Sequence, residues 1–249
     1  MLSLVTGASS GIGLQYATQL ARDYHTDLLL VSNQKEELQR VADELSAQYG
    51  VQAIAHYADL SLTDAAETLY NWCHEQNLQV DILINDAGVF FFNQYMDTSM
   101  KRIELMINLH VVTVAKMCRL FGADMVQRHS GYILNMSSMS AWMAMPGIQC
   151  YNASKAYILN FSKSMWYELK PHGVTVTAIT PGAIDTGLYG LAPNLRKLAV
   201  ALHVSMPPAK LVKKALKAMF KGKKKSMPGA VNYLNLAQEI LKRNKLNNN

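Results

Sequence analysis

Residues 6–13, TGASSGIG, decide the fold of this chain. They stand between a short apolar run at residues 3–6 and a pattern with helical spacing over residues 12–24. Glycines at these places allow a tight turn, a close approach of the backbone to a phosphate, and close packing of a helix on a strand. The N-terminus of the helix offers free N–H groups to an anion. The stretch predicts a nucleotide-binding turn, although a Gly/Ser-rich turn alone can be a simple connection.

Apolar runs and helical periods alternate along the rest of the chain. Strands are predicted at residues 3–6, 27–31, 51–57, 80–84, 132–136 and 175–179, and helices at 12–24, 35–49, 63–76, 99–128 and 150–169. The run at residues 27–31 lacks polar alternation, which is typical of a strand buried on both faces. Alternating strands and helices favour the α/β class, with a doubly wound parallel sheet of the Rossmann type flanked by helices on both faces.

Composition places the chain among globular proteins. Its 249 residues are 50% hydrophobic and 17% charged, which excludes a disordered chain and allows one large core. No repeat or linker divides it, so a single domain over residues 1–249 is predicted. A Gly- and Pro-rich region at about 183–208 follows the last predicted strand, where insertions cover the ligand crevice. We expect a substrate lid there, with an ordinary long loop as the alternative.

The compartment is expected to be the cytoplasm. No apolar run approaches the roughly 20 residues that span a bilayer, and the chain opens without a secretory pattern. The cysteines Cys73, Cys118 and Cys150 are widely spaced, so we expect no disulfide framework. The histidines form no HxxxH or HExxH pattern, so we expect no metal site. An integral membrane segment is not expected either.

The residues after the second predicted strand bear on the choice of dinucleotide. A carboxylate there would accept the ribose 2′-hydroxyl of NAD, but the chain has Ser32, Asn33 and Lys35. No acid repels a 2′-phosphate, and these side chains can donate to one. NADP(H) is therefore favoured over NAD(H), although no Arg is present. Asp59, followed by Leu60, is placed to contact the adenine, or else is a turn residue.

Two further segments end predicted strands with small or polar residues. In Asn85-Asp86-Ala87-Gly88, the small residues let a flat ring approach the backbone, and the Asn85 amide can tie neighbouring strands together. Ser138 follows the fifth strand, where a hydroxyl can bond a substrate oxygen as charge develops on it.

Tyr151 and Lys155 form the candidate proton-transfer pair. They are four positions apart on a predicted helix, hence on one face. A nearby ammonium favours the phenolate, so the pair can give a proton to a substrate oxygen or take one. An exposed ring beside a snorkelling lysine is the alternative. Asn108 is a polar residue expected to be buried in an apolar helical run, and it therefore needs a partner.

Together these motifs resemble the short-chain dehydrogenase/reductase family over nearly the whole chain, including members that act on 3-oxoacyl or hydroxysteroid-type substrates. The resemblance implies that Tyr151 donates or accepts the proton, and that Lys155 lowers its pKa and binds the nicotinamide ribose. It also implies that Ser138 positions the carbonyl and that Asn108 completes a water-linked proton relay. Two positions depart from the family pattern: Asp86 replaces a usual Asn, and Asn33 stands where many NADP-using members have Arg.

The cofactor contacts implied by the motifs and the resemblance run through the whole chain. They are Gly7, Ser9, Ser10, Gly11, Ile12, Gly13, Ser32, Asn33, Asp59, Leu60, Asn85, Ala87, Gly88, Tyr151, Lys155, Pro181, Gly182 and Thr186. The segment from Pro181 to Thr186 would contact the nicotinamide carboxamide.

The expected activity is NADPH-dependent reduction of an apolar ketone, or oxidation of the matching secondary alcohol. Residues 89–92, 139–145 and 188–203 are candidate pocket walls, and their apolar lining would be Phe90, Phe91, Phe92, Met143, Met145 and Tyr189, unless these are ordinary core residues. The alternatives are a non-catalytic dinucleotide-sensing or scaffold protein, an NAD-preferring alcohol or hydroxysteroid dehydrogenase, and an epimerase or dehydratase. By resemblance, the long helices at 99–128 and 150–169 would pair subunits into a homodimer or homotetramer.

The net charge of +6 comes from one end of the chain. Residues 209–245 hold 11 Lys and Arg and one acid, while residues 1–208 hold 13 Lys and Arg and 17 acids. The lysines from Lys210 to Lys221 have helical spacing and predict a solvated face, with residues 223–225 in a following turn. We expect no nucleic-acid partner; a membrane surface or an acidic carrier is the alternative reading of this stretch.

Overall fold

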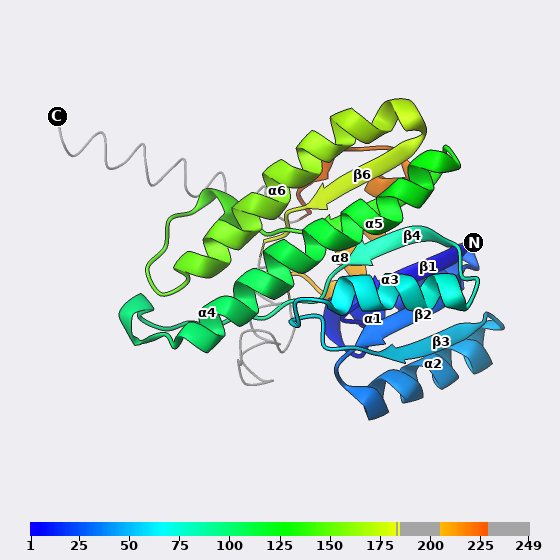
Figure 1. Cartoon of the computed structure of the whole chain (residues 1–249), viewed down its shortest axis with the longest axis horizontal. Coiled ribbons are helices and arrows are strands. Elements are labelled where there is room, and N and C mark those ends of the chain that lie inside the picture. Colours follow the sequence, from blue (N-terminus) through cyan, green and yellow to red (C-terminus); the bar gives the residue numbers. More distant parts are fainter. Residues whose placement is uncertain (183, 185–204, 229–249) are drawn as a thin grey trace.

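The computed structural model describes residues 1–182, 184 and 205–228. A seven-stranded sheet in the order β3-β2-β1-β4-β5-β6-β7 runs through this part (Figure 1). All of its neighbouring strands pair in parallel. The strands are β1 (Leu2–Thr6), β2 (Asp27–Ser32), β3 (Ala53–Tyr57), β4 (Val80–Asn85), β5 (Gly131–Met136), β6 (Val174–Ile179) and β7 (Lys225–Ser226). The predicted doubly wound α/β fold is confirmed.

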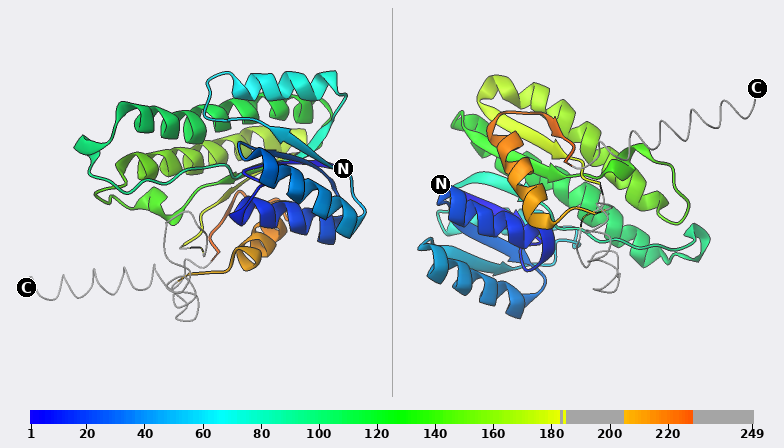
Figure 2. Two further views of the ribbon diagram at one scale, coloured as in Figure 1. Left: turned by 90° about the horizontal axis from the view of Figure 1, so that it is seen from below. Right: turned by 180° about the vertical axis from the view of Figure 1, so that it is seen from behind.

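Helices cover both faces of this sheet (Figure 2). The first layer contains α1 (Gly11–Tyr24), α2 (Lys35–Tyr49) and α8 (Pro208–Phe220). The second contains α3 (Ala65–Glu75), α5 (Thr113–Gln127) and α6 (Gln149–Leu169), with α4 (Met100–Ile107) projecting beyond the sheet. The short helical turns are η1 (Tyr95–Asp97), η2 (Asn108–Val112), η3 (Met139–Trp142) and η4 (Lys170–His172).

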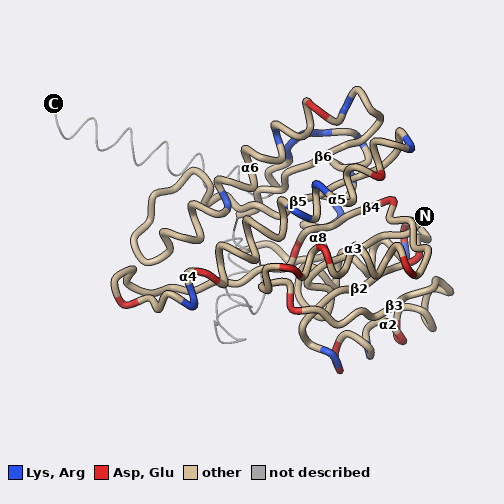
Figure 3. Tube along the Cα trace, viewed as in Figure 1, with Lys and Arg blue, Asp and Glu red and all other residues tan. Residues whose placement is uncertain are grey.

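The strand β2 shows why the predicted strands are apolar at consecutive positions. Leu28 and Leu30 pack into the core beneath α1 and α2, whereas Leu29 and Val31 pack into the core beneath α3 and α5. Side chains of a strand alternate between its faces, so a strand covered on both sides needs apolar residues throughout. Charged residues accordingly lie on helices, loops and strand ends rather than at the centre of the sheet (Figure 3).

The glycine turn joins β1 to α1 and brings the backbones of Gly7 and Gly13 close together. Gly7 and Gly11 have φ angles of +70° and +59°, a conformation that side chains with a Cβ rarely adopt. At Gly13, a Cβ would lie 2.2 Å from the carbonyl oxygen of Gly7. The Gly7 N–H also donates to the carbonyl oxygen of Val31 at 2.8 Å. These glycines let the helix begin directly over the end of the sheet.

The helix predicted over residues 99–128 contains a defect. Its α-helical parts α4 and α5 are separated by η2, a π-helical turn in which the Thr113 N–H donates to the Asn108 carbonyl. A π turn adds a residue to one helical turn and so rotates the side chains that follow.

Met100–Gln127 is long and apolar enough to cross a membrane by length and composition, but half of its most apolar window is buried in the protein. A core helix passes the same test.

The C-terminal basic segment is only partly as predicted. The lysines of α8 are exposed while Leu211, Val212 and Ala215 are buried, in agreement with the expected solvated face. The turn expected at residues 223–225 is wrong at Lys225, which forms β7 and pairs with Ala178 of β6. Strand β6 would otherwise present unpaired backbone groups at the sheet edge, and a lysine is tolerated there because its side chain reaches solvent.

The contact at Gly13 makes a stability prediction. Because an added methyl group would overlap the Gly7 carbonyl, we expect Gly13→Ala to lower the free energy of unfolding by about 1–3 kcal/mol. The control is Gly122→Ala in α5, where a Cβ would lie 3.5 Å from Ile133 Cδ1, an ordinary contact. Alanine favours a helix by up to about 1 kcal/mol over glycine, so the control variant should be neutral or more stable. Urea unfolding compares them, and equal losses would contradict the packing at Gly13.

Candidate active site

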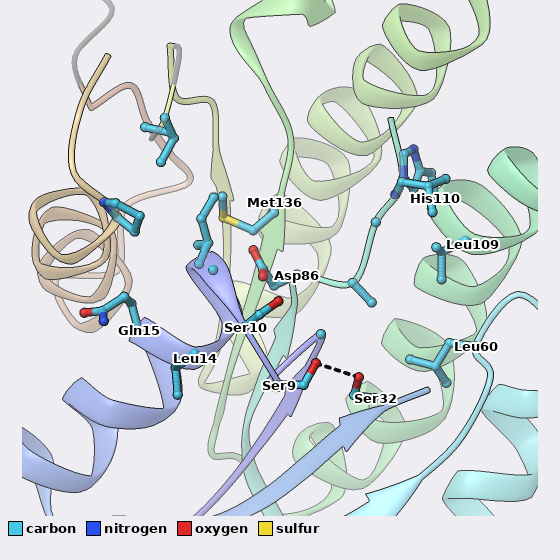
Figure 4. A pocket seen from close by; sticks show the side chains of 18 of the residues that line it. Ser9, Ser10, Leu14, Gln15, Ser32, Leu60, Asp86, Leu109, His110 and Met136 are labelled. Atoms are coloured by element: carbon cyan, nitrogen blue, oxygen red, sulfur yellow. Dashed lines mark hydrogen bonds between the residues drawn. The ribbon is translucent and has the colours of Figure 1, made fainter. Parts of the chain in front are cut away.

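A pocket of about 810 Å³ opens where the carboxyl ends of the parallel strands meet (Figure 4). It is lined from the glycine turn, from the ends of β2, β4 and β5, and from α6. The strand order reverses between β1 and β4, because β2 and β3 follow β1 on one side and β4 to β6 lie on the other. Ligands of open α/β sheets bind at such a reversal, so the fold places this pocket where a dinucleotide is expected.

Most of the predicted site residues are brought together at this pocket. Those that line it are Gly7, Ser9, Ser10, Gly11, Ile12, Ser32, Asn33, Asp59, Leu60, Ala87, Gly88, Ser138, Tyr151, Lys155, Pro181 and Gly182. Gly13, Asn85 and Asn108 are not part of the lining. Thr186 and most of the predicted lid at 183–208 lie outside the described residues.

The glycine turn forms the phosphate side of the pocket. Ser9 Oγ and Ser32 Oγ are 2.9 Å apart and join the turn to the end of β2. Ser10 precedes α1 in an extended conformation, and its side chain does not cap the helix. The first N–H groups of a helix have no partner within the helix. The turn therefore has the backbone and the donors that a pyrophosphate requires.

The end of β2 presents amides rather than charges to the pocket. Ser32 is buried, and its hydroxyl already bonds Ser9 and accepts from the Gln34 N–H. Asn33 is exposed and lines the pocket together with Gln34, whereas Lys35 does not line it. A phosphate on the ribose would thus meet Asn33 and Gln34 before Ser32 or Lys35.

Asp59 has the local role of a turn residue as well as a place in the pocket lining. Its Oδ1 accepts from the Ser61 N–H at 3.0 Å and from Ser61 Oγ at 2.7 Å. Leu60, beside it, is buried, and its carbonyl accepts from Thr113 Oγ1 at 2.7 Å. These bonds hold the loop after β3 against the start of α5, next to the pocket.

Lys155 is buried with its ammonium beside Tyr151. Its Nζ donates to the Met136 carbonyl at 2.9 Å and lies 5.5 Å from the centroid of the Tyr151 ring. The Ser137 hydroxyl donates to the Lys155 carbonyl at 2.7 Å, which ties α6 to the end of β5. Burial lowers the pKa of Lys155 to about 8, and the Asp86 carboxylate opposes this shift. The predicted proximity of Lys155 and Tyr151 is present in the fold.

Ser138 stands at the pocket with a hydroxyl that can still donate. It precedes η3, and its Oγ accepts from the Ser140 N–H at 3.1 Å. Accepting this bond leaves the hydroxyl proton for another partner. Ser138 can therefore donate to an oxygen in the pocket.

The surroundings of Tyr151 are apolar, but the predicted wall side chains that the structure describes, Phe90 to Phe92, Met143 and Met145, are not part of the pocket lining. The Tyr151 ring packs in a cluster with Met106 and Ile148, and Phe90 meets it edge-on at 5.0 Å between centroids. Phe91 packs against the same cluster. Phe92, Met143 and Met145 are exposed. Tyr189 and residues 188–203 lie outside the described residues.

The exposed Phe92 ring lies against the backbone of Gly147. The Asn93 N–H donates to the Gly147 carbonyl at 3.0 Å, and Gly147 has a φ of +84°. A Cβ at Gly147 would lie 3.0 Å from the Phe92 ring. The ring thus packs on this glycine, and neither Phe92 nor Gly147 is part of the pocket lining.

Asn108 does not occupy the buried position predicted for it. It is only half-buried and begins the π turn η2, where its carbonyl accepts the Thr113 N–H. The turn rotates Leu109 and His110 inward, and both of these are buried and line the pocket. The apolar run therefore identified the right stretch of helix but the wrong buried polar residue.

After β4, the Asn85 amide is expected to bond neighbouring strands, and Asp86 departs from the family pattern. Asn85 makes that bond, because its Nδ2 donates to Asn135 Oδ1 at 2.8 Å across β4 and β5. The Asp86 side chain is half-buried at the pocket wall (Figure 4). Desolvation raises its pKa to about 7, against the opposing effects of Lys155 and a hydrogen bond from the Gly13 N–H. The departure from the usual Asn was the sequence signal for this role.

His110 is a pocket residue that the sequence patterns did not single out. It is 1% exposed, its Nε2 accepts from the Val89 N–H at 3.0 Å, and its Nδ1 lies 2.9 Å from Ser154 Oγ. Burial, with a smaller effect from Lys155, lowers its pKa well below the usual value. A second polar residue two positions after Asn108 in the same apolar run was the only available signal.

Known proteins are similar to this chain in sequence and in fold. A family model for short chain dehydrogenases matches residues 2–193. The very-long-chain 3-oxoacyl-CoA reductase of Anas platyrhynchos is 34% identical over 191 residues, covering 74% of this chain and 60% of that protein. The 17-beta-hydroxysteroid dehydrogenase type 3 of Mus musculus is 33% identical over 187 residues, with the same two coverages of 74% and 60%. The chain thus spans about 60% of the length of these curated relatives.

A solved structure extends the similarity to the tertiary level. The short-chain dehydrogenase from Sphingobium yanoikuyae, solved in complex with NADPH, is 30% identical. Its TM-score is 0.83, and the match covers 97% of this chain and 95% of that one. In the present chain, the glycine turn, the amides at the end of β2 and the small residues after β4 fit a nicotinamide dinucleotide.

The raised pKa of Asp86 predicts a pH-dependent difference in stability. The carboxyl has a pKa of about 7 in the folded protein, compared with an ordinary value of 3.8. Between these two values the folded state retains a proton that the unfolded chain releases. Stability therefore falls as the pH rises through this range. Asp86→Asn removes that loss, and we expect the variant to be more stable than the parent by about 2 kcal/mol at pH 8. This figure is less than the full pKa shift would give, because water in the pocket screens part of it.

At pH 4 the parent carboxyl is protonated in the folded state, so the two proteins should have nearly equal free energies of unfolding. Urea unfolding at pH 4, 6 and 8 measures the difference. A difference that stays constant across this range, or a variant less stable than the parent at pH 8, would contradict the raised pKa.

Proposed function

Since the chain belongs to the short-chain dehydrogenase family, we propose that it reduces an apolar ketone with NADPH, or oxidises the matching secondary alcohol. The observation that carries this proposal is the buried ammonium of Lys155, 5.5 Å from the centroid of the Tyr151 ring at the wall of the dinucleotide pocket. A buried lysine is costly to retain. A dinucleotide-sensing or scaffold protein has no use for this arrangement with Tyr151 and Ser138, whereas a carbonyl reductase needs it.

The residues divide the reaction among them. A nicotinamide cofactor, when bound, supplies the hydride to the carbonyl carbon or takes it from the alcohol. In the direction of reduction, the Tyr151 hydroxyl gives its proton to the substrate oxygen, and the Lys155 ammonium stabilises the phenolate that remains. The Ser138 hydroxyl donates to the same oxygen as negative charge develops on it. Ketone, hydride and proton together make the secondary alcohol, and oxidation reverses each step.

An apolar substrate is supported by the cluster around Tyr151. Phe90, Met106 and Ile148 pack beside the phenol, so the parts of a substrate next to its reacting oxygen meet hydrocarbon. Two relatives are named for a very-long-chain 3-oxoacyl-CoA and for a 17-beta-hydroxysteroid. Both names describe carbonyl or alcohol groups on large apolar skeletons, in agreement with a ketone of that class here.

The preference for NADP(H) is proposed from the residues after β2. Asn33 and Gln34 face the pocket, and neither carries the negative charge that would repel a 2′-phosphate. The structural relative from Sphingobium yanoikuyae holds NADPH. An NAD-preferring alcohol dehydrogenase is the second candidate, favoured by the lack of an Arg at residues 32–35.

The cellular setting is proposed together with the activity. We place the protein in the cytoplasm as a homodimer or homotetramer, without a nucleic-acid partner and without an integral membrane segment. Exposed apolar side chains on α4 and α6, namely Met100, Ile107 and Tyr157, support a contact between subunits along these helices.

Replacing the proton donor tests the reaction. We expect Tyr151→Phe to lower kcat for reduction of apolar ketones by at least about 100-fold, the usual contribution of general acid catalysis. NADPH binding, followed by nicotinamide fluorescence, should persist because the ring remains. Tyr157→Phe on the same helix is the matched control, since Tyr157 is 36% exposed and stacks on Phe161. Retained turnover in Tyr151→Phe would refute the proposed proton donor.

A charge at position 33 tests the cofactor preference. Asn33→Asp places a carboxylate beside the expected 2′-phosphate, and repulsion should weaken NADPH binding by about tenfold or more relative to NADH. Asn33→Ala is the control, because it removes the amide without adding charge. Fluorescence titrations with both cofactors give the ratio of dissociation constants. A parent protein that binds NADH more tightly than NADPH would overturn the preference.

A further inference from the structure

His110 is a buried imidazole that connects two parts of the active site. It lies in the π turn η2, between the loop after β4 and the helix α6. Its Nε2 accepts from the Val89 N–H at 3.0 Å, while its Nδ1 is 2.9 Å from Ser154 Oγ. The ring also meets the Tyr151 ring edge-on, with 5.8 Å between centroids. No step of the proposed reaction uses this imidazole.

The hydrogen bonds determine the protonation state of the ring. A backbone N–H can only donate, so the Nε2 that faces Val89 must carry a lone pair. In a neutral imidazole the proton is then on Nδ1, which donates to Ser154 Oγ. The Ser154 hydroxyl donates its own proton to the Tyr151 carbonyl at 2.8 Å. The chain of bonds therefore runs in one direction, from Val89 through His110 and Ser154 to the backbone of Tyr151.

Burial, together with the charge of Lys155, keeps this ring neutral. Burial and the Lys155 ammonium of α6 both disfavour the imidazolium, and the other titratable groups that line the same pocket are Asp59, Asp86 and Tyr151. Protonating Nε2 would break the bond from Val89 and place a second cation near Lys155. Among the residues that line the pocket, Lys155 is thus the cation that acts on the Tyr151 phenol.

The fit of the ring restricts its neighbours as well. A Cβ at Gly88 would lie 3.0 Å from His110 Nε2. The small residue that precedes Val89 is therefore needed for the imidazole to reach the Val89 N–H. The ring therefore bridges the loop after β4, which borders the dinucleotide pocket, and the helix that carries Tyr151, next to the packing of Phe90 on the Tyr151 ring.

We propose that His110 is a positioning residue: as a neutral Nδ1–H imidazole it links the Val89 N–H to Ser154 and so holds the first turns of α6, which carry Tyr151 and Lys155, against the loop after β4. This assignment rests on the proposed function for its consequence in catalysis. The link requires both nitrogens at once, one as an acceptor and one as a donor. A residue that keeps one of the two bonds should not replace it.

Two variants separate the two bonds. His110→Asn places an amide N–H near the position of Nδ1, so it can keep the bond to Ser154 but not the one to Val89. His110→Gln places an amide oxygen near the position of Nε2, so it can keep Val89 and lose Ser154. Ser154→Ala interrupts the chain while leaving the imidazole in place. His56→Asn and His56→Gln are the matched controls, because His56 packs on Trp72 and does not line the pocket.

Turnover and titration of the phenol provide the variant readouts. We expect each His110 variant and Ser154→Ala to lower kcat by about tenfold with little change in KM, as for one lost hydrogen bond. The midpoint of the Tyr151 titration, taken as the ultraviolet difference against Tyr151→Phe, should move to higher pH in all three. The His56 variants should move neither. A His110→Asn or His110→Gln protein with the parent kcat and titration midpoint overturns the proposal.

A measurement on the unaltered protein covers the case in which the variants fail to fold. The ¹⁵N shifts of the His110 imidazole, assigned by comparison with Ser154→Ala or with selectively labelled protein, should show the neutral Nδ1–H tautomer at pH 7. A charged ring or an Nε2–H tautomer overturns the proposal. If no ketone is turned over with either cofactor, the proposed function fails, while the ring tautomer and the Tyr151 titration still decide whether His110 forms the link.

Discussion

A parallel sheet is stable only when apolar layers cover both of its faces, and the rest of this structure depends on that requirement. Leu28 and Leu30 pack into one core while Leu29 and Val31 pack into the other. Helices must therefore cross over between successive strands, and every strand then ends at the same edge. The pocket forms at that edge because the connections leave β1 and β4 in opposite directions. The site is thus a consequence of covering the sheet.

The same burial sets the electrostatics of the pocket. Lys155, Asp86 and His110 come from α6, the end of β4 and the π turn, and each is partly or fully removed from water. Desolvation disfavours their charged forms, so it lowers the pKa of Lys155 and His110 and raises that of Asp86. The Met136 carbonyl accepts from the Lys155 ammonium, which helps to keep that cation beside the phenol. The positive charge in the pocket is therefore that of the Lys155 ammonium, next to the Tyr151 ring.

The family match and a residue that departs from the family pattern at the pocket wall give complementary information about the chemistry. The match to short chain dehydrogenases over residues 2–193 assigns the family, and the tyrosine and lysine expected from it lie together in the pocket. Asp86 shows what the chain has changed. A carboxyl in place of an amide puts a titratable group on the wall that faces the glycine turn, where the Gly13 N–H bonds it. The charge on this wall therefore depends on whether the Asp86 carboxyl holds its proton.

The sequence by itself determined the order of strands and helices, the nucleotide turn and the pairing of Tyr151 with Lys155, because these depend on local periods and on spacing along one helix. It also indicated the basic, solvated face of α8. It did not reveal the π turn at Asn108, since a helical period does not show where one extra residue is inserted. That turn decided that His110, not Asn108, is the buried polar residue. Nor did the sequence show that Phe92 packs on Gly147 or that Asp86 meets the Gly13 N–H, because these partners are far apart in sequence and only the tertiary fold brings them close.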